Sequence, residues 1–176
     1  MLELLAPAGS MEALRAAVQN GANAVYLGSG QFNARQSAQN FTPQTLQEAV
    51  KYCHVRNVQV HLTLNTLVSD KETNEAVTLI RQAAASGVDA FIVQDLGVVQ
   101  LCRQIAPHVA IHGSTQMTVH SLPGVQFCAG MGMRRVVLSR ELSREEIRYI
   151  CANSPIEIEV FGHGALCMCY SGQCYM

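Results

Sequence analysis

Short strand-like runs alternate with longer helix-like segments along the whole chain, and this alternation restricts the fold more than any other feature. Repeating βα units of about 25 residues are typical of parallel sheets whose strands are joined by crossover helices. The sequence therefore predicts seven parallel strands. The strand-like runs are Leu2–Ala6, Ala24–Gly28, Val58–Asn65, Ala90–Asp95, Ala110–Gln116, Arg135–Ser139 and Glu157–Phe161.

Helix-end signals lie between these runs. Serine or threonine precedes several apolar-periodic segments, as N-cap residues do, and glycine follows two of them, as C-terminal residues do. Proline after Thr42 occupies the favoured first helical position. The signals are Ser10 and Gly21, then Thr42-Pro43, then Asp70–Ser86 before Gly87, and Ser143-x-x-Glu146, which is a capping box.

Polar residues share one parity in three of the expected strands. Alternate strand residues face opposite sides of a sheet, so each of these strands has one polar and one apolar face. Strands of an open sheet covered by helices on both faces are continuously apolar instead. We therefore predict an α/β fold of the (β/α)8 TIM-barrel type with a polar interior, an unusual content that indicates a function. The polar sets are Gln59, His61, Thr63 and Asn65; His112, Ser114 and Gln116; and Glu157 and Glu159.

The chain is short for a complete barrel. Such barrels usually take about 250 residues, whereas this chain has 176 residues and seven strand-like runs. We expect one domain, residues 1–176, that is an incomplete barrel and an N-terminal fragment of a longer protein. Its edge strands would be exposed, or a second copy in a homodimer or a partner subunit would complete the barrel.

Charge and cysteine content restrict the partners and the compartment. The net charge of −1 gives no long-range attraction to nucleic acid. The sequence shows no signal peptide and no membrane-spanning run, which predicts a cytoplasmic protein without a membrane partner. Seven cysteines then point to reduced thiols or metal ligands rather than disulfides. The basic cluster Arg134, Arg135, Arg140, Arg144 and Arg148 is interpreted as a solvated surface paired with neighbouring glutamates.

Catalytic groups of barrels lie at the carboxyl ends of the strands. Polar residues at these ends predict a substrate-binding mouth formed by Arg35, Asn65, Asp95, Gln116 and Arg140. The candidate catalytic residues are His163 at this mouth and Glu159 and His112 in the interior. Adjacent interior carboxylates require a cationic neighbour. The alternative is that the interior network only fixes the fold.

A glycine-rich loop near the C-terminus carries Cys167, Cys169 and Cys174. Thiolates select zinc, copper(I) or iron-sulfur clusters. The Cys167-x-Cys169 spacing is too tight for the usual zinc pair, which disfavours zinc. Two alternatives remain open: a nucleophilic thiol, with His163 near Cys167 and Glu159 below, and ordinary reduced loop cysteines.

The run Glu159-x-Phe161-x-x-Gly164-Ala165-Leu166-Cys167, followed by Gly172-x-Cys174-x-Met176, resembles the signature of the collagenase-like peptidase family, whose catalytic type is unknown. Residues Leu4–Ser10 and Val136–Ser143 resemble that family too. The resemblance implies a barrel-like fold and a relationship to iron-sulfur-dependent tRNA and rRNA hydroxylases. It also implies that Cys167 and Cys174 are ligands of a 4Fe-4S cluster in the full-length protein, and that prephenate, a dicarboxylate, is a co-substrate suited to Arg35 and Arg140. Cys169 departs from the family pattern and is left out of the ligand set.

Three functions follow as expectations for the full-length protein. The preferred one is iron-sulfur-dependent hydroxylation of an RNA base or a similar ring. A peptidase acting on collagen-like or unfolded polypeptides is the first alternative, and a non-catalytic partner or scaffold subunit is the second. The substrate is accordingly RNA or a polypeptide, and the 176-residue chain alone, without an intact cluster, is expected to be inactive.

Overall fold

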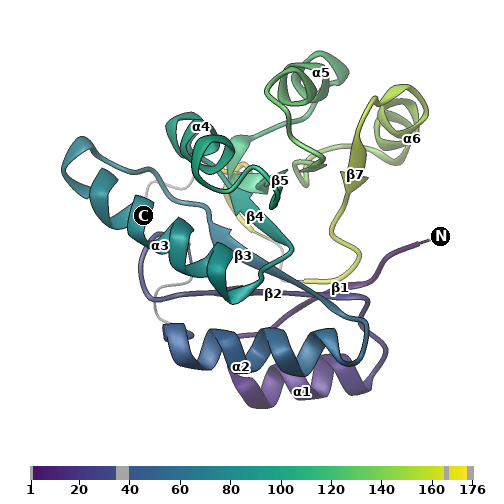
Figure 1. Cartoon of the computed structure of the whole chain (residues 1–176). Helices are drawn as coiled ribbons and strands as arrows, with labels where there is room; N and C mark the ends of the chain where they lie inside the picture. The colour runs from purple at the N-terminus through teal and green to yellow at the C-terminus, as the bar shows by residue number, and fades with distance from the viewer. Residues whose placement is uncertain (1, 35–39, 165–166, 174–176) are drawn as a thin grey trace.

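A computed structural model of the chain describes residues 2–34, 40–164 and 167–173. These residues form seven strands and six α-helices in strict alternation (Figure 1). The 3-10 helix η1 (Asp70–Glu72) precedes α3, and η2 (Thr115–Met117) follows β5. The other elements are β1 (Leu5–Pro7), α1 (Met11–Gln19), β2 (Ala24–Gly28), α2 (Pro43–His54), β3 (Gln59–Leu64), α3 (Thr73–Ser86), β4 (Ala90–Val93), α4 (Leu96–Ile105), β5 (Ala110–Gly113), α5 (Leu122–Gly130), β6 (Arg135–Val137), α6 (Arg144–Asn153) and β7 (Glu157–Glu159).

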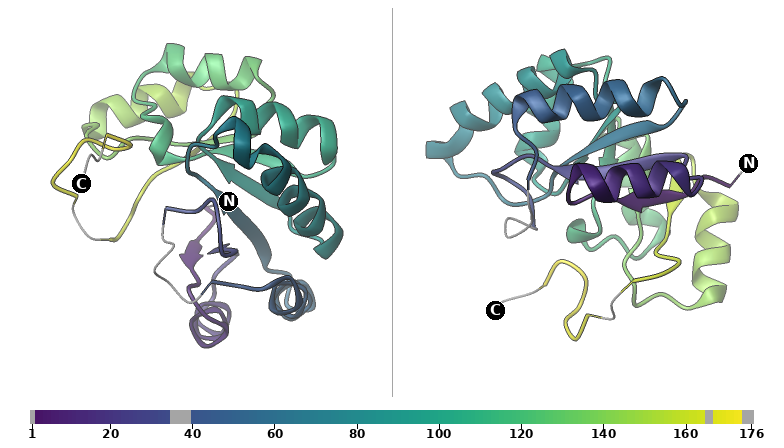
Figure 2. Two further views of the ribbon diagram at one scale, coloured as in Figure 1. Left: turned by 90° about the vertical axis from the view of Figure 1, so that its left-hand side faces the viewer. Right: turned by 90° about the horizontal axis from the view of Figure 1, so that it is seen from below.

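The described strands form one parallel sheet in the order β1-β2-β3-β4-β5-β6-β7. No strand order reverses, as it would in a doubly wound sheet. The sheet curls, and the helices lie along its outer side (Figures 1 and 2). These features confirm the predicted TIM-like α/β fold with seven strands, in which β1 and β7 are the edges of an incomplete barrel.

Local sequence determines where several helices begin and end. The Ser10 hydroxyl accepts the Ala13 N–H, and Ser143 and Glu146 form a reciprocal capping box. Gly87 ends α3 with a φ of 87°, a conformation that favours glycine. Two boundaries differ from the predictions. The first strand begins at Leu5 rather than Leu2, and Asp70–Glu72 forms a separate 3-10 turn before α3.

The hydrophobic core lies between the sheet and the helices. The outward-facing residues of the central strands are apolar and buried against one face of each helix. Three of the four helical cysteines, Cys53, Cys102 and Cys128, are buried there as expected, whereas Cys151 is exposed. Representative core residues are Val25, Leu27, Val60, Leu62, Phe91, Val93 and Val136 of the strands and Leu14, Leu46, Ile80, Val99, Val125 and Ile150 of the helices.

The opposite faces of the strands form the barrel interior. Register places His61 beside Ala90 on β4, and His112 beside Arg135 on β6. Arg135 in turn pairs with Glu157 on β7. The parity that the sequence marks as polar therefore faces inward, and the interior is charged.

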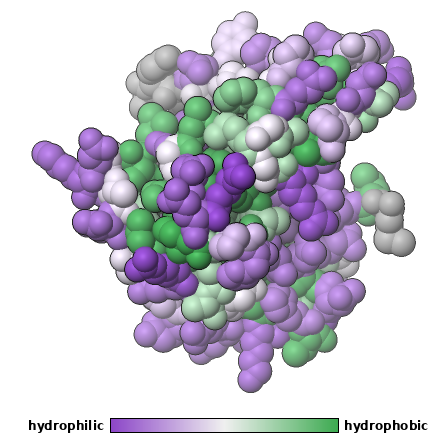
Figure 3. Space-filling model, turned by 45° about the horizontal axis from the view of Figure 1, so that its top comes forward, coloured by the Kyte–Doolittle hydropathy of each residue, from purple (hydrophilic) through white to green (hydrophobic). Residues whose placement is uncertain are grey.

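The outer surface is mainly hydrophilic, with apolar residues in separate patches (Figure 3). Within the described part of the chain, no helix is long and apolar enough to cross a membrane.

Candidate functional site

The carboxyl ends of the strands bring small polar side chains together. Asn65 follows β3 and Ser114 follows β5, and the Asn65 amide donates to the Ser114 hydroxyl over 3.4 Å. The Asn65 side-chain oxygen accepts the Ala34 N–H at 3.0 Å. Asn65 thus links three βα loops at one mouth of the barrel.

Two hydroxyl groups near this mouth have no hydrogen-bond partner among the described residues. They belong to Ser139, two residues beyond β6, and Thr115, at the start of η2. Ser139 is only 3% exposed. An unpaired buried hydroxyl costs about 1–3 kcal/mol, so a ligand or water at this mouth would gain a hydrogen bond. Ser139 was not among the predicted binding residues, although it ends the strand-like run Arg135–Ser139.

Residues 167–173 lie across the loops that follow β5 and β6. Ser171 is fully buried; its hydroxyl donates to Glu141 at 3.0 Å and accepts the Arg140 N–H at 3.1 Å. The Thr118 hydroxyl donates to the Ser171 carbonyl at 2.8 Å. Gly172 has a φ of 76°, and a Cβ there would collide with the Gln116 carbonyl oxygen. The segment is therefore fixed by specific contacts, and Gln116 meets it through its backbone.

These contacts place the Cys167 thiol beside Arg140. Hydrogen bonds from the Cys169 backbone N–H and from the Arg140 guanidinium lower the pKa of Cys167, which is exposed. The guanidinium carbon of Arg140 also lies 5.7 Å from the centre of the Phe161 ring. The site therefore presents a thiolate-prone sulfur next to a fixed cation.

The other predicted residues of this mouth lie in different settings. The Asp95 carboxylate accepts the N–H groups of Gly97 (2.7 Å) and Val98 (3.2 Å), and so caps α4. His163 is exposed after β7, and among the described hydrogen bonds none joins it to Cys167 or Glu159. Arg35 and Cys174 lie outside the described residues.

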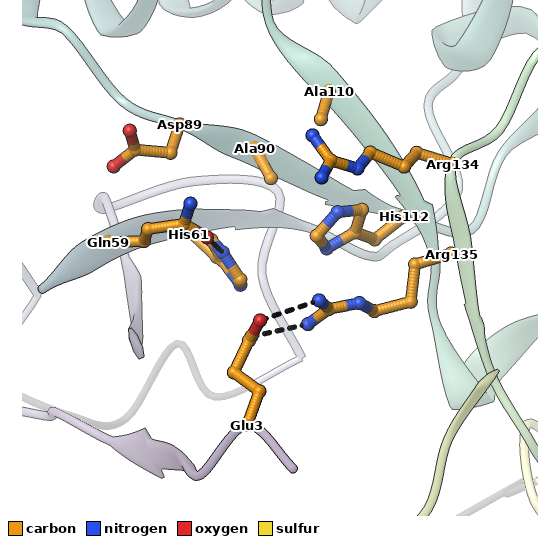
Figure 4. Close-up of a pocket in the computed structure, with 9 residues that line it drawn as sticks. All are labelled: Glu3, Gln59, His61, Asp89, Ala90, Ala110, His112, Arg134 and Arg135. Atoms are coloured by element: carbon orange, nitrogen blue, oxygen red, sulfur yellow. Dashed lines mark hydrogen bonds and ion pairs between the residues drawn. The ribbon is translucent and has the colours of Figure 1, made fainter. Parts of the chain in front are cut away.

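The amino-terminal mouth of the barrel contains a cluster of charges around Arg135 (Figure 4). The Arg135 guanidinium, whose side chain is 11% exposed, bonds both Glu3 oxygens at 2.7 and 2.9 Å and Glu157 at 2.7 Å. It also lies 3.4 Å from Glu159. The Arg135 hydrogen bonds lower the pKa of Glu3. Arg135 thus connects the chain before β1 to β6 and β7, across the gap between the two sheet edges.

Two stacked histidines complete this cluster. The His61 and His112 rings meet edge to face with centroids 4.8 Å apart. Burial lowers the pKa of His61 to about 4 and that of His112 to about 2, so both are neutral at pH 7. Burial raises the pKa of Glu159, against the attraction of Arg135. His112 and Glu159, two of the predicted catalytic residues, therefore belong to this interior cluster.

The cationic neighbour expected for the interior carboxylates is Arg135. The interpretation of Arg135 as part of a solvated basic surface is wrong, because its side chain is buried among three glutamates. Its parity with Val137 and Ser139 on β6 was the signal that could have placed it inside. Glu3, its bidentate partner, gave no signal because it precedes the strand and lies 132 positions away.

The donor set allows a partial test of the expected iron-sulfur cluster. Cys167 is an exposed thiol with a lowered pKa, which suits thiolate ligation. Its expected partner ligand, Cys174, is outside the described residues. Among the residues that are described, no three histidine, cysteine, aspartate or glutamate side chains are grouped to hold a metal ion.

A second hollow, of about 580 Å³, lies outside the barrel between α5 and α6. Leu122, Gln126, Glu145 and Tyr149 are among the residues that line it. It is separate from both strand-end clusters.

Comparison with known proteins agrees with the barrel geometry. The chain is 40% identical over 175 residues to a 23S rRNA 5-hydroxycytidine synthase of Escherichia coli, covering 99% of this chain and 26% of that protein. It is 37% identical over 174 residues to tRNA hydroxylation protein P1 of Bacillus subtilis, covering 99% of this chain and 41% of the relative. A collagenase of Porphyromonas gingivalis is 34% identical over 186 residues, covering 99% of this chain and 44% of the collagenase. The chain thus spans less than half the length of these relatives.

A solved U32 peptidase structure superimposes with a TM-score of 0.72 at 15% identity, covering 91% of this chain and 68% of that one. This likeness concerns the fold alone. Residues 9–176 match the family described as Peptidase family U32. The chain, with its seven-stranded TIM-like barrel, therefore belongs to peptidase family U32.

Proposed function

We propose that the protein acts in the hydroxylation of an RNA base, with the base held at the carboxyl-terminal mouth of the barrel. The observation that carries this proposal is the position of Cys167 beside Arg140, over a mouth lined by Asn65, Ser114 and Ser139. Support comes from the relatives named as an rRNA hydroxycytidine synthase and a tRNA hydroxylation protein.

The residues of the mouth match the needs of a nucleobase. A base edge presents neutral hydrogen-bond donors and acceptors, and hydroxyl and amide groups can pair with either kind. Asn65, Ser114 and the unpaired Ser139 hydroxyl supply such groups. Bases must leave the stack to be read in this way, so a single-stranded or looped RNA is the substrate we propose.

Arg140 has two roles in this proposal. It stabilises the Cys167 thiolate, and its exposed guanidinium can pair with a carboxylate, such as one of prephenate, or with an RNA phosphate. A 4Fe-4S cluster held by Cys167 and Cys174 would supply electron transfer for the oxidation. His163, exposed at the same mouth, is a candidate for moving a proton.

The decisive experiment measures modified nucleosides. Total RNA from a strain that lacks the gene is digested and analysed by mass spectrometry, and the gene is returned as wild type, Cys167→Ser or Cys151→Ser. We expect a hydroxylated nucleoside to disappear on deletion, to return with wild type and Cys151→Ser, and to remain more than about tenfold reduced with Cys167→Ser, because a removed thiolate ligand cannot be replaced by a hydroxyl. Cys151 is the matched control because it is an exposed cysteine on α6, away from the mouth. Unchanged nucleosides in the deletion strain would refute the proposal.

A peptidase is the alternative that one observation favours: a thiol with a lowered pKa is also a potential nucleophile. A relative is named a collagenase. Gelatin hydrolysis that survives iron chelation but is lost in Cys167→Ser would establish this alternative. Absence of both activities would favour a non-catalytic partner subunit, in which the β1 and β7 edges pair with a second copy or a partner chain.

A further inference from the structure

A small cavity of about 50 Å³ lies at the amino-terminal mouth, at the opposite end of the barrel from Cys167. Its walls come from the first residues of several strands and from residues just before them (Figure 4). The volume suffices for one or two water-sized groups and excludes a nucleobase or a metabolite. The lining includes Gln59, His61, Asp89, His112, Arg134 and Arg135.

Two ring nitrogens that line this cavity region lack partners. The Nδ1 atoms of His61 and His112 are buried and have no hydrogen-bond partner among the described residues. His61 is 0% and His112 3% exposed. His61 Nε2 lies 3.4 Å from Gln59 Oε1, which assigns the proton to Nε2 and leaves Nδ1 as an acceptor. An unpaired buried acceptor is costly, so the cavity requires an occupant that donates hydrogen bonds.

The charges around the cavity select the sign of that occupant. The carboxylates of Glu3, Asp89, Glu157 and Glu159 outnumber the guanidinium groups of Arg134 and Arg135, four to two. His54 and the Val60 N–H occupy part of Asp89 but add at most one positive charge. Both interior histidines are uncharged at pH 7 because they are buried. A cation is therefore favoured over an anion.

The same residues disfavour a metal ion. A transition-metal site needs at least three protein ligands converging on one point. The described histidine, cysteine, aspartate and glutamate side chains contain no such group. Nitrogen acceptors with carboxylates farther away suit a ligand that carries its own N–H donors.

We propose that this cavity binds an ammonium group, either the free ammonium ion or the end of a primary amine, through hydrogen bonds to the Nδ1 atoms of His61 and His112. The surrounding carboxylates balance the charge of the ligand. The site is independent of the proposed RNA chemistry, because it lies at the other end of the barrel and shares no residue with that mouth.

The test compares cations of similar size. Thermal unfolding of the purified protein is measured at pH 7 and equal ionic strength in ammonium, methylammonium, potassium or sodium chloride. Potassium matches ammonium in radius but has no N–H donors. We expect the unfolding midpoint to rise by about 3 °C in ammonium, when it is present at about ten times its Kd, relative to potassium. A rise in methylammonium as well would identify the amine end as the ligand, and a rise in ammonium alone would identify the free ion.

A pair of variants locates the effect. His61→Gln should abolish the difference between ammonium and potassium, whereas His120→Gln, at an exposed histidine beyond β5, should retain it. A second readout avoids dependence on variants: the side-chain nitrogen signals of the buried histidines in wild-type protein should shift with ammonium and not with potassium. Equal midpoints and unshifted nitrogen signals in all four salts would overturn the proposal and leave water as the occupant.

Discussion

The two mouths of the barrel differ in how their polar groups are satisfied. At the amino-terminal mouth, Arg135 binds Glu3, Glu157 and Glu159, and the charges are largely buried. At the carboxyl-terminal mouth, Asn65, Ser114 and Ser139 are uncharged, and the charged Arg140 lies on the surface. One mouth uses charge to hold strands together, and the other leaves hydrogen-bonding groups and a thiol accessible.

This difference shows that strongly shifted pKa values do not by themselves locate the chemistry. The pKa values of His61 and His112 are lowered furthest by burial, yet both histidines lie below the mouth where the family-signature cysteine is located. Position at the strand ends separates the two mouths better than charge does. The comparison can be tested by substitutions at each mouth.

The largest effect should follow Arg135→Met. Removing this guanidinium leaves three partly buried carboxylates without a counter-charge, so we expect the free energy of unfolding in urea to fall by about 3 kcal/mol. Arg134→Met is the matched control, because the Arg134 side chain is 66% exposed and makes one ion pair of 3.4 Å to Glu157. Its loss should stay below about 1 kcal/mol. Equal losses in the two variants would remove the distinction between a structural and an accessible mouth.

Acidification should have the next largest effect. The folded-state pKa values of His61 and His112 lie near 4 and 2, whereas an unfolded histidine titrates near about 6.5. Below that pH the unfolded chain binds protons that the folded protein does not, so stability falls as pH falls. We expect a loss of about 2 kcal/mol per histidine between about pH 7 and pH 5. Glu159, with its raised pKa, acts in the opposite direction because the folded state takes up its proton first.

Urea unfolding at several pH values in this range measures the slope. The double variant His61→Gln, His112→Gln should flatten it, and His120→Gln, at an exposed position, should leave it unchanged. An unaltered slope in the double variant would show that other groups cause the acid sensitivity.

The smallest change in stability should follow Ser139→Ala at the other mouth. The Ser139 hydroxyl has no partner among the described residues, so its removal should leave the free energy of unfolding within about 0.5 kcal/mol of wild type or raise it. RNA hydroxylation should nevertheless fall, since the substrate would lose a hydrogen bond. Ser86→Ala, on the exposed side of α3, should change neither quantity. A marked destabilisation by Ser139→Ala would assign this hydroxyl to the fold instead.

Patterns within one strand predicted the fold well. The polar parity of His61, His112 and Glu159 placed them inside the barrel, and the Ser143-x-x-Glu146 spacing located the start of α6. These signals succeed because strand alternation and helix capping depend on neighbouring residues.

Contacts between distant segments could not be predicted in the same way. The Glu3–Arg135 pair depends on how far the sheet curls, which sequence spacing does not determine. Asp95 was expected to bind substrate, yet its carboxylate caps α4, a role that its position one residue before the helix also permits. The polar residues at strand ends include both helix caps and ligand-binding groups, and the sequence alone does not separate them.

The anchoring of Ser171 has an evolutionary consequence. One buried hydroxyl serves Arg140 and Glu141, while the adjacent Gly172 leaves no room for a side chain against the Gln116 carbonyl. Changes at positions 171 and 172 should therefore be inherited together with compensating changes at Thr118, Arg140 or Glu141. Homologues that have drifted at one of these positions alone should be rare, even where the surrounding loops vary freely.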